Sequence, residues 1–135
     1  MGDPETQPIM RRLNSDLFEV LLAATQEKLD EITLDWAANV AIGVVIAAEK
    51  YPDTPRSGDI ITLTDDTNEC VTFHAGTQLD ENGHTLTNGG RVLCVTATAP
   101  TLLAAQALAY EHIQKIQFYG MQYRKDIGYR AVDLI

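Results

Sequence analysis

A run of apolar residues from Val40 to Ala48 is the feature that most limits what this chain can fold into. The run is rich in β-branched side chains, which favour strands over helices. Tyr51-Pro52 ends it, because proline cannot donate the backbone hydrogen bond that a central strand requires. A short, continuous apolar run of this kind predicts a strand that is buried on both faces. It is also far shorter than the roughly 20 residues that span a bilayer, so we expect no membrane segment.

The residues before this run have helical periodicity. Pro8 suits the first turn of a helix, where its missing N–H costs nothing. Apolar residues then recur every three or four positions, at Ile9, Leu13, Leu17, Val20, Leu21 and Ala24. This spacing predicts one amphipathic helix that ends near Lys28.

The residues after the run alternate between strand-like segments and turns. Asn82-Gly83 is a strong hairpin signal, because both residue types tolerate a positive φ. A second helix is expected to begin at Pro100 or Thr101, and the tail from Phe118 is expected to be a loop with a short closing strand. The predicted strands are 60–63, 71–77, 84–87 and 91–97. Antiparallel strands in the middle, with helices toward both ends, predict an α+β fold.

The charge of the chain excludes one class of function. Its 135 residues carry a net charge of −9, which argues against binding to the phosphate backbone of nucleic acids. Residues 112–135 carry four bases and two acids, however, so this end could face an anionic small molecule. On charge alone, we favour the simpler interpretation that these side chains face solvent. Cys70 and Cys94 show no pairing motif, and without a signal peptide they are expected to be free thiols in a reducing cytoplasm.

Four polar segments are candidates for chemistry. Asp3 and Glu5 precede the first helix, where carboxylates either cap free N–H groups or contact a metal or an amine; capping is the preferred interpretation. The segment 87–93 places Arg91 after two glycines, and it is either a ligand-binding loop or a bulge that redirects a strand. The segment 123–130 mixes tyrosines with charges of both signs. The segment 73–77 places His74 near a glycine, and a hydrogen-bonded structural role is the preferred interpretation. No metal-ligand spacing links His74, His84 and His112.

Taken in order, five segments resemble the glycinamide ribonucleotide synthetase family (phosphoribosylamine–glycine ligases). They are GDPETQPIM at 2–10, IGVV at 42–45 with Tyr51-Pro52 after it, FHAGT at 73–77, TNGGRVLCVTA at 87–97 and YRKDIGYRA at 123–131. The resemblance extends over essentially the whole chain. One departure is Glu49-Lys50, where the family often has Gly-Gly before the Tyr-Pro pair.

The resemblance implies an ATP-grasp ligase that uses ATP and Mg²⁺ to join glycine to 5-phosphoribosylamine, giving glycinamide ribonucleotide in purine biosynthesis. It implies that residues 1–36 are the end of the ATP-grasp domain, a signature loop plus a helix. Residues 37–135 would form the antiparallel, β-rich C-terminal ligase domain. The family's magnesium ligands lie upstream of its Gly-Asp-Pro-Glu motif, and its nucleotide-binding lobes have no counterpart here. We therefore expect no metal site in this chain and no activity from this portion alone.

The resemblance also implies a set of substrate-binding residues. Asp3 and Glu5 match signature acids beside the active site, and Arg91 could meet a substrate phosphate or carboxylate. Arg124 and Asp126 match the family's closing motif and could pair with each other or orient the site. The candidates are Asp3, Glu5, Asn88, Gly89, Gly90, Arg91, Arg124 and Asp126. None of them is a nucleophile or an evident general base, which suits phosphoryl transfer by positioning and electrostatic stabilisation.

Two other functions remain as alternatives. The chain could be a stand-alone binding or assembly module, because an uncovered apolar helix face usually finds a partner, either the missing ATP-grasp lobes or a second copy. It could also belong to a related ATP-grasp enzyme such as a carboxylase, which the segments TNGGRVL and YRKDIG disfavour. The expected partners are thus glycine and 5-phosphoribosylamine in the intact enzyme, with no nucleic acid and no membrane.

Overall fold

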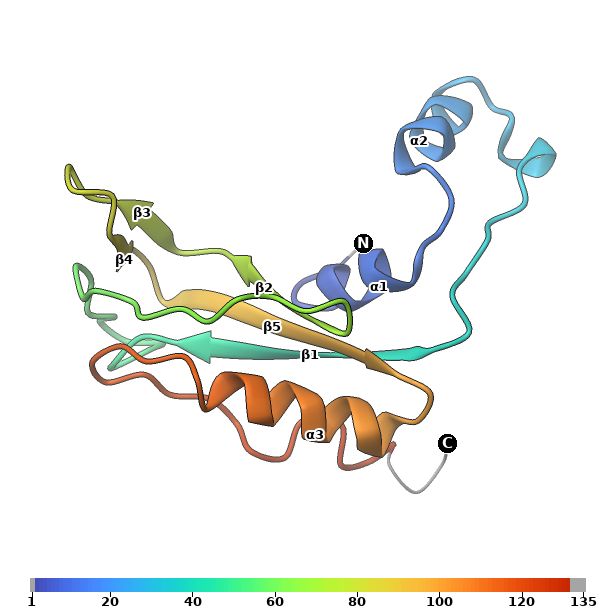
Figure 1. Ribbon diagram of the computed structural model, residues 1–135. Helices are drawn as coiled ribbons and strands as arrows, with labels where there is room; N and C mark the ends of the chain where they lie inside the picture. The colour runs from blue at the N-terminus through green and yellow to red at the C-terminus, as the bar shows by residue number, and fades with distance from the viewer. Residues whose placement is uncertain (1, 132–135) are drawn as a thin grey trace.

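A computed structural model describes residues 2–131 and shows an α+β fold, as the sequence predicts. Antiparallel strands occupy the middle of the described chain, and helices lie toward both of its ends (Figure 1). The elements are α1 Thr6–Arg12, α2 Leu17–Thr25, the short 3₁₀ helix η1 Leu29–Glu31, β1 Val40–Ala47, β2 Cys70–His74, β3 Thr77–Leu79, β4 Thr85–Thr87, β5 Arg91–Ala99 and α3 Leu102–Ile113. Among these residues, no helix has the length and apolar character needed to cross a membrane.

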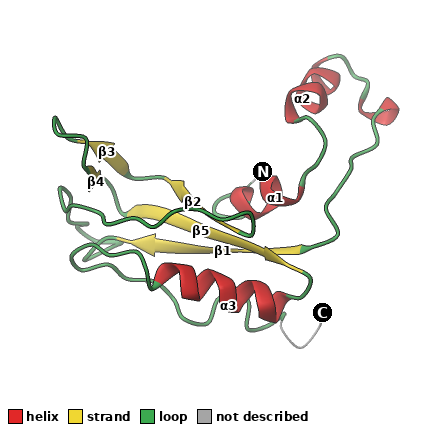
Figure 2. Ribbon diagram, viewed as in Figure 1, coloured by secondary structure: helices red, strands yellow, loops and turns green. Residues whose placement is uncertain are grey.

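The main sheet has three antiparallel strands in the order β1-β5-β2, with β5 in the centre. Its two faces are covered by different helices, α3 on one side and α1 on the other (Figure 2). Ile42, Val44 and Ile46 of β1 are buried toward α3, whereas the alternate residues Ala41, Gly43 and Val45 are only half-buried. The prediction of a strand buried on both faces is therefore correct for one face only. The reason is that α1, with seven residues, covers less of the sheet than α3 does.

The core lies between this sheet and α3. Ile46, Leu93 and Ile113 are among the largest side chains that are fully buried there. The alanines Ala105 and Ala109 face the sheet and are completely buried, so small side chains let the helix backbone approach the strands closely. Full burial of each large aliphatic side chain contributes about 1.5–3 kcal/mol, so this one interface supplies most of the apolar stabilisation.

A β-bulge at the end of the β1–β5 ladder changes which face the following residues occupy. Ile46 pairs with Leu93, but the next pair is Ala47 with Arg91, so Val92 is the extra residue. Strict alternation from Leu93 would direct Arg91 toward α3. The extra residue instead places Arg91 opposite Ala47, on the face that α1 covers.

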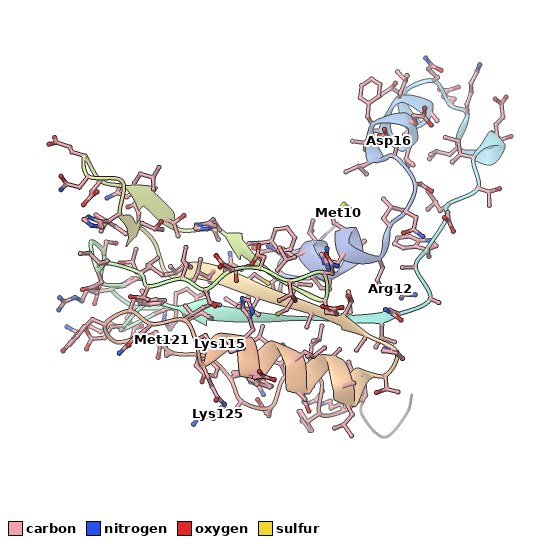
Figure 3. The ribbon with its side chains drawn as sticks, in the orientation of Figure 1. Met10, Arg12, Asp16, Lys115, Met121 and Lys125 are labelled. Carbon is pink, nitrogen blue, oxygen red and sulfur yellow. The ribbon has the colours of Figure 1, made fainter. Side chains whose placement is uncertain are left out.

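The single N-terminal helix predicted from Pro8 to near Lys28 is wrong, because the chain forms two helices separated by a turn. Asp16 accepts a hydrogen bond from the backbone N–H of Phe18 at 2.8 Å and so begins a new helix (Figure 3). Apolar spacing alone does not reveal this break, because Leu13 and Leu17 keep the helical period across it. The local signal is Asp16 itself, whose short carboxylate competes for backbone N–H groups.

The segment from α2 to Trp36 projects away from the sheet as an arm, which we define as residues 14–36 (Figure 1). Its two ends are joined by a bridge between Leu13 and Trp36 and by a hydrogen bond from the Asn14 N–H to the Asp35 carbonyl at 2.9 Å. Beyond this junction, α2 packs mainly against η1. The arm is thus fixed at its base while its apolar side chains stay outside the core.

The predicted hairpin at Asn82-Gly83 is confirmed by the antiparallel pairing of β3 with β4. Gly83 has a φ of +83°, and Asp80 accepts hydrogen bonds from the backbone N–H groups of Asn82 and His84. The strand predicted at 60–63 is wrong, since that segment forms only isolated bridges at Ile60 and Thr62. The predicted closing strand is absent from residues 118–131, and the last four residues lie outside the described part.

Candidate functional site

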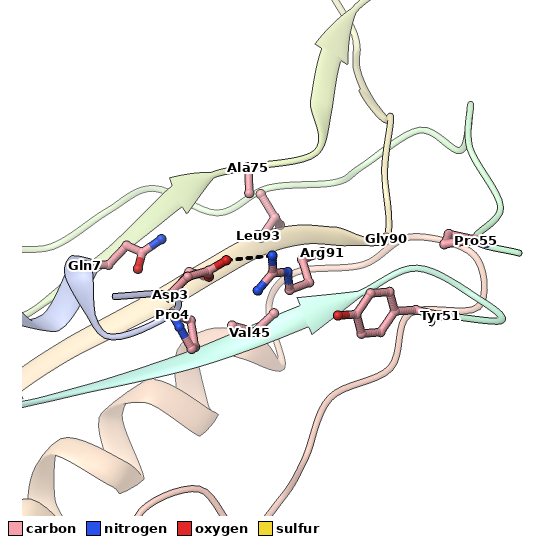
Figure 4. Close-up of a pocket in the computed structure, with 11 residues that line it drawn as sticks. Asp3, Pro4, Gln7, Val45, Tyr51, Pro55, Ala75, Gly90, Arg91 and Leu93 are labelled. Atoms are coloured by element: carbon pink, nitrogen blue, oxygen red, sulfur yellow. Dashed lines mark ion pairs between the residues drawn. The ribbon is translucent and has the colours of Figure 1, made fainter. Parts of the chain in front are cut away.

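Arg91 and Asp3 form the central contact of the candidate site. A guanidinium Nη2 of Arg91 lies 2.7 Å from Oδ2 of Asp3, although the two residues are 88 positions apart in the chain (Figure 4). The bulge in β5 turns Arg91 toward α1, and Asp3 lies just before α1. Both side chains remain partly exposed, so this pair adds little to stability and its geometry matters more than its energy.

Two adjoining hollows open around this pair. The first hollow has a volume of about 420 Å³, and Asp3, Gln7, Tyr51 and Arg91 lie on its walls. The second hollow has about 520 Å³ and includes Arg124 among its lining residues. The two hollows share a wall made of four residues, Pro4, Val45, Tyr51 and Arg91. Each volume falls within the roughly 300–1,000 Å³ that is typical of small-molecule sites.

Arg124 brings a second guanidinium to the second hollow. Its Nε and Nη2 donate to the two carboxylate oxygens of Asp126 at 2.9 and 2.7 Å, a bidentate arrangement. The hydrogen bonds from Arg124 hold the pKa of Asp126 below its ordinary value, and the same contact raises the pKa of Arg124. Both side chains are exposed, so the arrangement orients a permanently charged group at a surface opening.

The structure brings some of the predicted site residues together and leaves others apart. Asp3, Gly90, Arg91 and Arg124 line the two hollows. Asp126 lies on neither wall and reaches the site only through Arg124. Glu5 lines a third, mostly apolar groove that adjoins the second hollow at Pro4 and Gly43, and neither Asn88 nor Gly89 lines either hollow. We therefore keep Asp3, Arg91 and Arg124 as the centre of the predicted site.

The glycines of this loop permit close backbone approaches. A Cβ on Gly90 would lie 2.4 Å from Cδ2 of Tyr51, so only glycine lets the aromatic ring lie against the backbone here. A Cβ on Gly76 would lie 2.8 Å from the carbonyl oxygen of Arg91, and the Gly76 N–H donates to that oxygen at 2.9 Å. Both glycines thus hold the start of β5 in place.

The preferred capping role for the two N-terminal acids is wrong. Glu5 occupies the N-cap position of α1, but its side chain makes no capping hydrogen bond. Asp3 instead pairs with Arg91. A cationic partner from the sheet outweighs the local N–H groups for Asp3, because a charge-assisted contact with a guanidinium is the stronger interaction.

Sequence reasoning missed Tyr51 and Gln122 as residues of the site, whereas Tyr123, which lines the second hollow, belongs to the candidate segment 123–130. Tyr51 stood out only as part of a Tyr-Pro pair that ends a strand, and its position between the hollows depends on the fold of the turn. Gln122 lies in the tail, where its Nε2 donates to the carbonyl oxygens of Ala48 at 2.8 Å and Tyr51 at 3.2 Å. Gly90 leaves room for the ring of Tyr51, but the two residues are far apart in the chain, so no local pattern in the sequence reveals this packing.

The three histidines line neither hollow, whereas Cys94 lies on the wall of the first one. His74, His84 and His112 bond to Thr77, Asp80 and Thr72 respectively. Cys70 and Cys94 are buried free thiols, and burial raises the pKa of Cys70 to about 11. Within residues 2–131, no group of three or more His, Cys, Asp and Glu side chains is arranged to hold a metal ion.

Known proteins similar to this chain are phosphoribosylamine–glycine ligases. The chain is 58% identical over 133 residues to the phosphoribosylamine–glycine ligase of Ralstonia nicotianae, and 48% identical over 134 residues to that of Escherichia coli K12; each match covers 98% of this chain and 31% of the relative. It also resembles the crystal structure of phosphoribosylamine–glycine ligase from Thermotoga maritima, with 36% identity and a TM-score of 0.74, over 94% of this chain and 31% of that one.

The chain therefore spans about a third of the length of these relatives. The family model that matches is the C domain of phosphoribosylglycinamide synthetase, over residues 41–130. These residues include β1, all the strands after it, α3 and the Arg124–Asp126 pair. By this match and by its likeness to the ligases, the chain belongs to the phosphoribosylglycinamide synthetase C-domain family.

Proposed function

We propose that this chain acts as the C-terminal part of an ATP-dependent ligase that joins glycine to 5-phosphoribosylamine and gives glycinamide ribonucleotide in purine biosynthesis. The names of its relatives and its C-domain family support this assignment. We assign residues 1–36 to the end of the preceding ATP-grasp domain and 37–135 to the C-terminal ligase domain. We place the protein in the cytoplasm, where its buried thiols stay reduced.

The observation that carries the proposal is the position of Arg91. The Asp3 carboxylate holds one Nη of the guanidinium at 2.7 Å, while the remaining N–H donors stay available where two hollows meet. A guanidinium fixed in this way suits a phosphate or carboxylate oxygen, and 5-phosphoribosylamine and glycine carry one of these groups each. In this proposal Asp3 orients Arg91 and does not itself take part in bond making.

ATP and Mg²⁺ belong to the reaction but do not fit the described residues of this chain. Mg²⁺ binds through carboxylate oxygens and water, yet Asp3 and Asp126 are each held by an arginine. Residues 2–131 also contain no acidic cluster that would hold the ion. We therefore assign nucleotide and metal binding to the part of the ligase that this chain does not match.

The experiment compares ADP formation in three samples that contain ATP, Mg²⁺, glycine and 5-phosphoribosylamine. They hold this chain alone, the unmatched part of the Ralstonia ligase alone, and both together. We expect glycine-dependent ADP formation only from the mixture. Turnover by this chain alone, or a mixture that folds and associates but stays inactive, would contradict the proposal.

A second candidate function, assembly, is favoured by the arm. Phe18 is 70% exposed, Leu29 is 53% exposed and Trp36 is 42% exposed, although such side chains usually pack in cores or interfaces. The arm also lies outside the residues that match the C-domain family, while the match to the ligases includes it. We propose that it docks on the rest of the ligase. Light scattering of the chain alone tests the competing possibility, since a stable dimer would show that the arm binds a second copy.

A further inference from the structure

We propose that the second hollow binds the sugar ring of a pentose 5-phosphate, with Tyr51 as the residue that selects for the ring. In this arrangement the phosphate lies at Arg91 and Arg124, and the sugar lies against the aromatic face of Tyr51. The assignment rests on the proposed function, because one of the proposed substrates is a pentose phosphate. It goes further by naming which residues recognise which part of that molecule.

The two guanidiniums supply the anion end of the site. Arg91 and Arg124 both line the second hollow, yet they come from a strand and from the tail. Each is held by one carboxylate, Arg91 at a single nitrogen and Arg124 along its Nε–Nη2 edge. A guanidinium has five N–H donors, so each keeps donors for the oxygens of an incoming phosphate.

Tyr51 supplies an apolar surface next to these donors. Its ring lies against the backbone of Gly90, where any side chain would collide with it. The Cδ2–Cε2 edge of the ring is therefore supported by protein, while the position of the ring in both hollows leaves other ring surface in contact with the open space. Such a rigid ring offers contact area to the C–H groups of a sugar at little cost in conformational entropy.

Gln122 supplies a hydrogen-bond acceptor for a hydroxyl group. Its Nε2 donates to the carbonyl oxygens of Ala48 and Tyr51, which fixes the orientation of the amide. The amide oxygen is left without a protein partner among the described hydrogen bonds, and Gln122 lines the second hollow. Guanidinium donors, a supported aromatic ring and an amide acceptor together match phosphate, sugar ring and hydroxyl better than they match a phosphate ion or an amino acid.

The test measures binding of ribose 5-phosphate and of inorganic phosphate to this 135-residue chain by NMR titration. We expect ribose 5-phosphate to bind about tenfold more tightly than inorganic phosphate. This difference is the size expected for one contact between the sugar and the aromatic ring of Tyr51. Tyr51→Ala is expected to remove this advantage and leave phosphate binding unchanged. Tyr51→Phe is expected to retain it, because the ring face makes the contact.

Two further variants separate recognition from folding. Gly90→Ala keeps the tyrosine but displaces its ring, so we expect the same selective loss as in Tyr51→Ala. Tyr119→Ala is the control, because it removes an exposed tyrosine that lines neither hollow. We expect this variant to bind ribose 5-phosphate as tightly as the parent chain does. Melting curves of each variant report whether the fold is intact.

The proposal is overturned if the parent chain binds both anions equally or not at all, or if Tyr51→Ala weakens the binding of both alike. A Tyr51→Phe variant that loses as much selectivity as Tyr51→Ala would also overturn it. These outcomes are independent of catalysis. An inactive mixture with the rest of the ligase would contradict the proposed reaction while leaving the measured preference for the sugar phosphate intact.

Discussion

Lys50 has a left-handed backbone conformation, with a φ of 65°, in the turn that places Tyr51 between the hollows. A side chain with a Cβ is strained in this region, whereas glycine adopts it readily. The family often has glycine at this point, so the turn keeps the shape that glycine favours although lysine occupies it. Hydrogen bonds from Arg56 N–H to Glu49 O and from Ala48 N–H to Gly90 O hold the turn in this shape.

We predict that Lys50→Gly stabilises the chain by about 1 kcal/mol, because it relieves the left-handed strain. Lys50→Ala is the matched control, since it removes the charge but keeps the Cβ, and it should leave the strain in place. Urea denaturation monitored by circular dichroism measures both. Equal stability of the glycine and alanine variants would show that the backbone at this position is not strained.

His112 makes stability depend on pH. It is buried beside Thr72, whose Oγ1 lies 3.0 Å from Nε2, and burial lowers the pKa of its imidazole below the ordinary 6.5. Asp66 opposes this effect at 4.0 Å, while Lys115 adds to it. Because the folded pKa is the lower one, the folded state binds fewer protons than the unfolded state just below pH 6.5.

We therefore predict that the melting temperature falls as the pH is lowered from 7 to 5. The contribution of neutral His112 is fully present above the unfolded pKa and is lost as the pH falls through the folded pKa. His112→Gln can keep the hydrogen bond to Thr72 but cannot titrate, so its melting temperature should change less over this range. If the melting temperatures of the parent chain and of His112→Gln change in parallel with pH, groups other than His112 cause the pH dependence.

At the scale of elements, α2 and α3 differ in what supports them. Both begin with a side-chain cap, Asp16 bonding the N–H of Phe18 and Thr101 bonding the N–H of Ala104. The helix α3 is buried against the sheet, whereas α2 packs mainly against η1. An isolated helix of nine residues has little stability of its own, so α2 depends on its cap more than α3 does.

We predict that Asp16→Ala and Thr101→Ala have different consequences, although each removes one cap worth about 1 kcal/mol. Asp16→Ala should speed amide hydrogen exchange within α2 and leave the global melting temperature unchanged. Thr101→Ala should lower the global melting temperature, because α3 unfolds together with the core. A global loss of stability in Asp16→Ala would show that the arm is part of the cooperative fold.

The elements that the sequence predicts well are those whose signal is local. The hairpin at Asn82-Gly83 and the strand through Val44 follow from turn chemistry and from apolar content. The break in the N-terminal helix was missed because Leu13 and Leu17 keep the helical period on either side of it. The Asp3–Arg91 pair and the place of Tyr51 join distant segments, so no local pattern encodes their distances.

At the scale of the whole molecule, exposed apolar side chains lie both on the arm and on α3, and we expect those of the arm to contact the rest of the ligase. Phe18 and Leu21 are 70% and 51% exposed on the arm, and Leu103 is 61% exposed on α3. We predict that Phe18→Ser with Leu21→Ser weakens association with the unmatched part of the Ralstonia ligase at least about tenfold, as expected for two apolar contacts of an interface. Leu103→Ser is the control, and both variants should melt like the parent chain.

Analytical ultracentrifugation of the mixtures measures this association. Equal weakening by the arm variant and by Leu103→Ser would show that exposed leucines matter regardless of their position. Unchanged association of the arm variant would place the contact elsewhere on the chain, with the apolar groove beside Ile9 and Leu102 as the next surface to test.

The extra residue in β5 has a consequence for how the chain tolerates length changes. Removing Val92 would make Arg91 the direct neighbour of Leu93, so plain alternation would keep its guanidinium opposite Ala47, on the face that α1 covers. Every pair from Val40 to Ile46 could keep its partner, and the sheet could still form. Loss of this one residue would thus leave the guanidinium on the side of Asp3, and the fold would lose only the buried side chain of Val92.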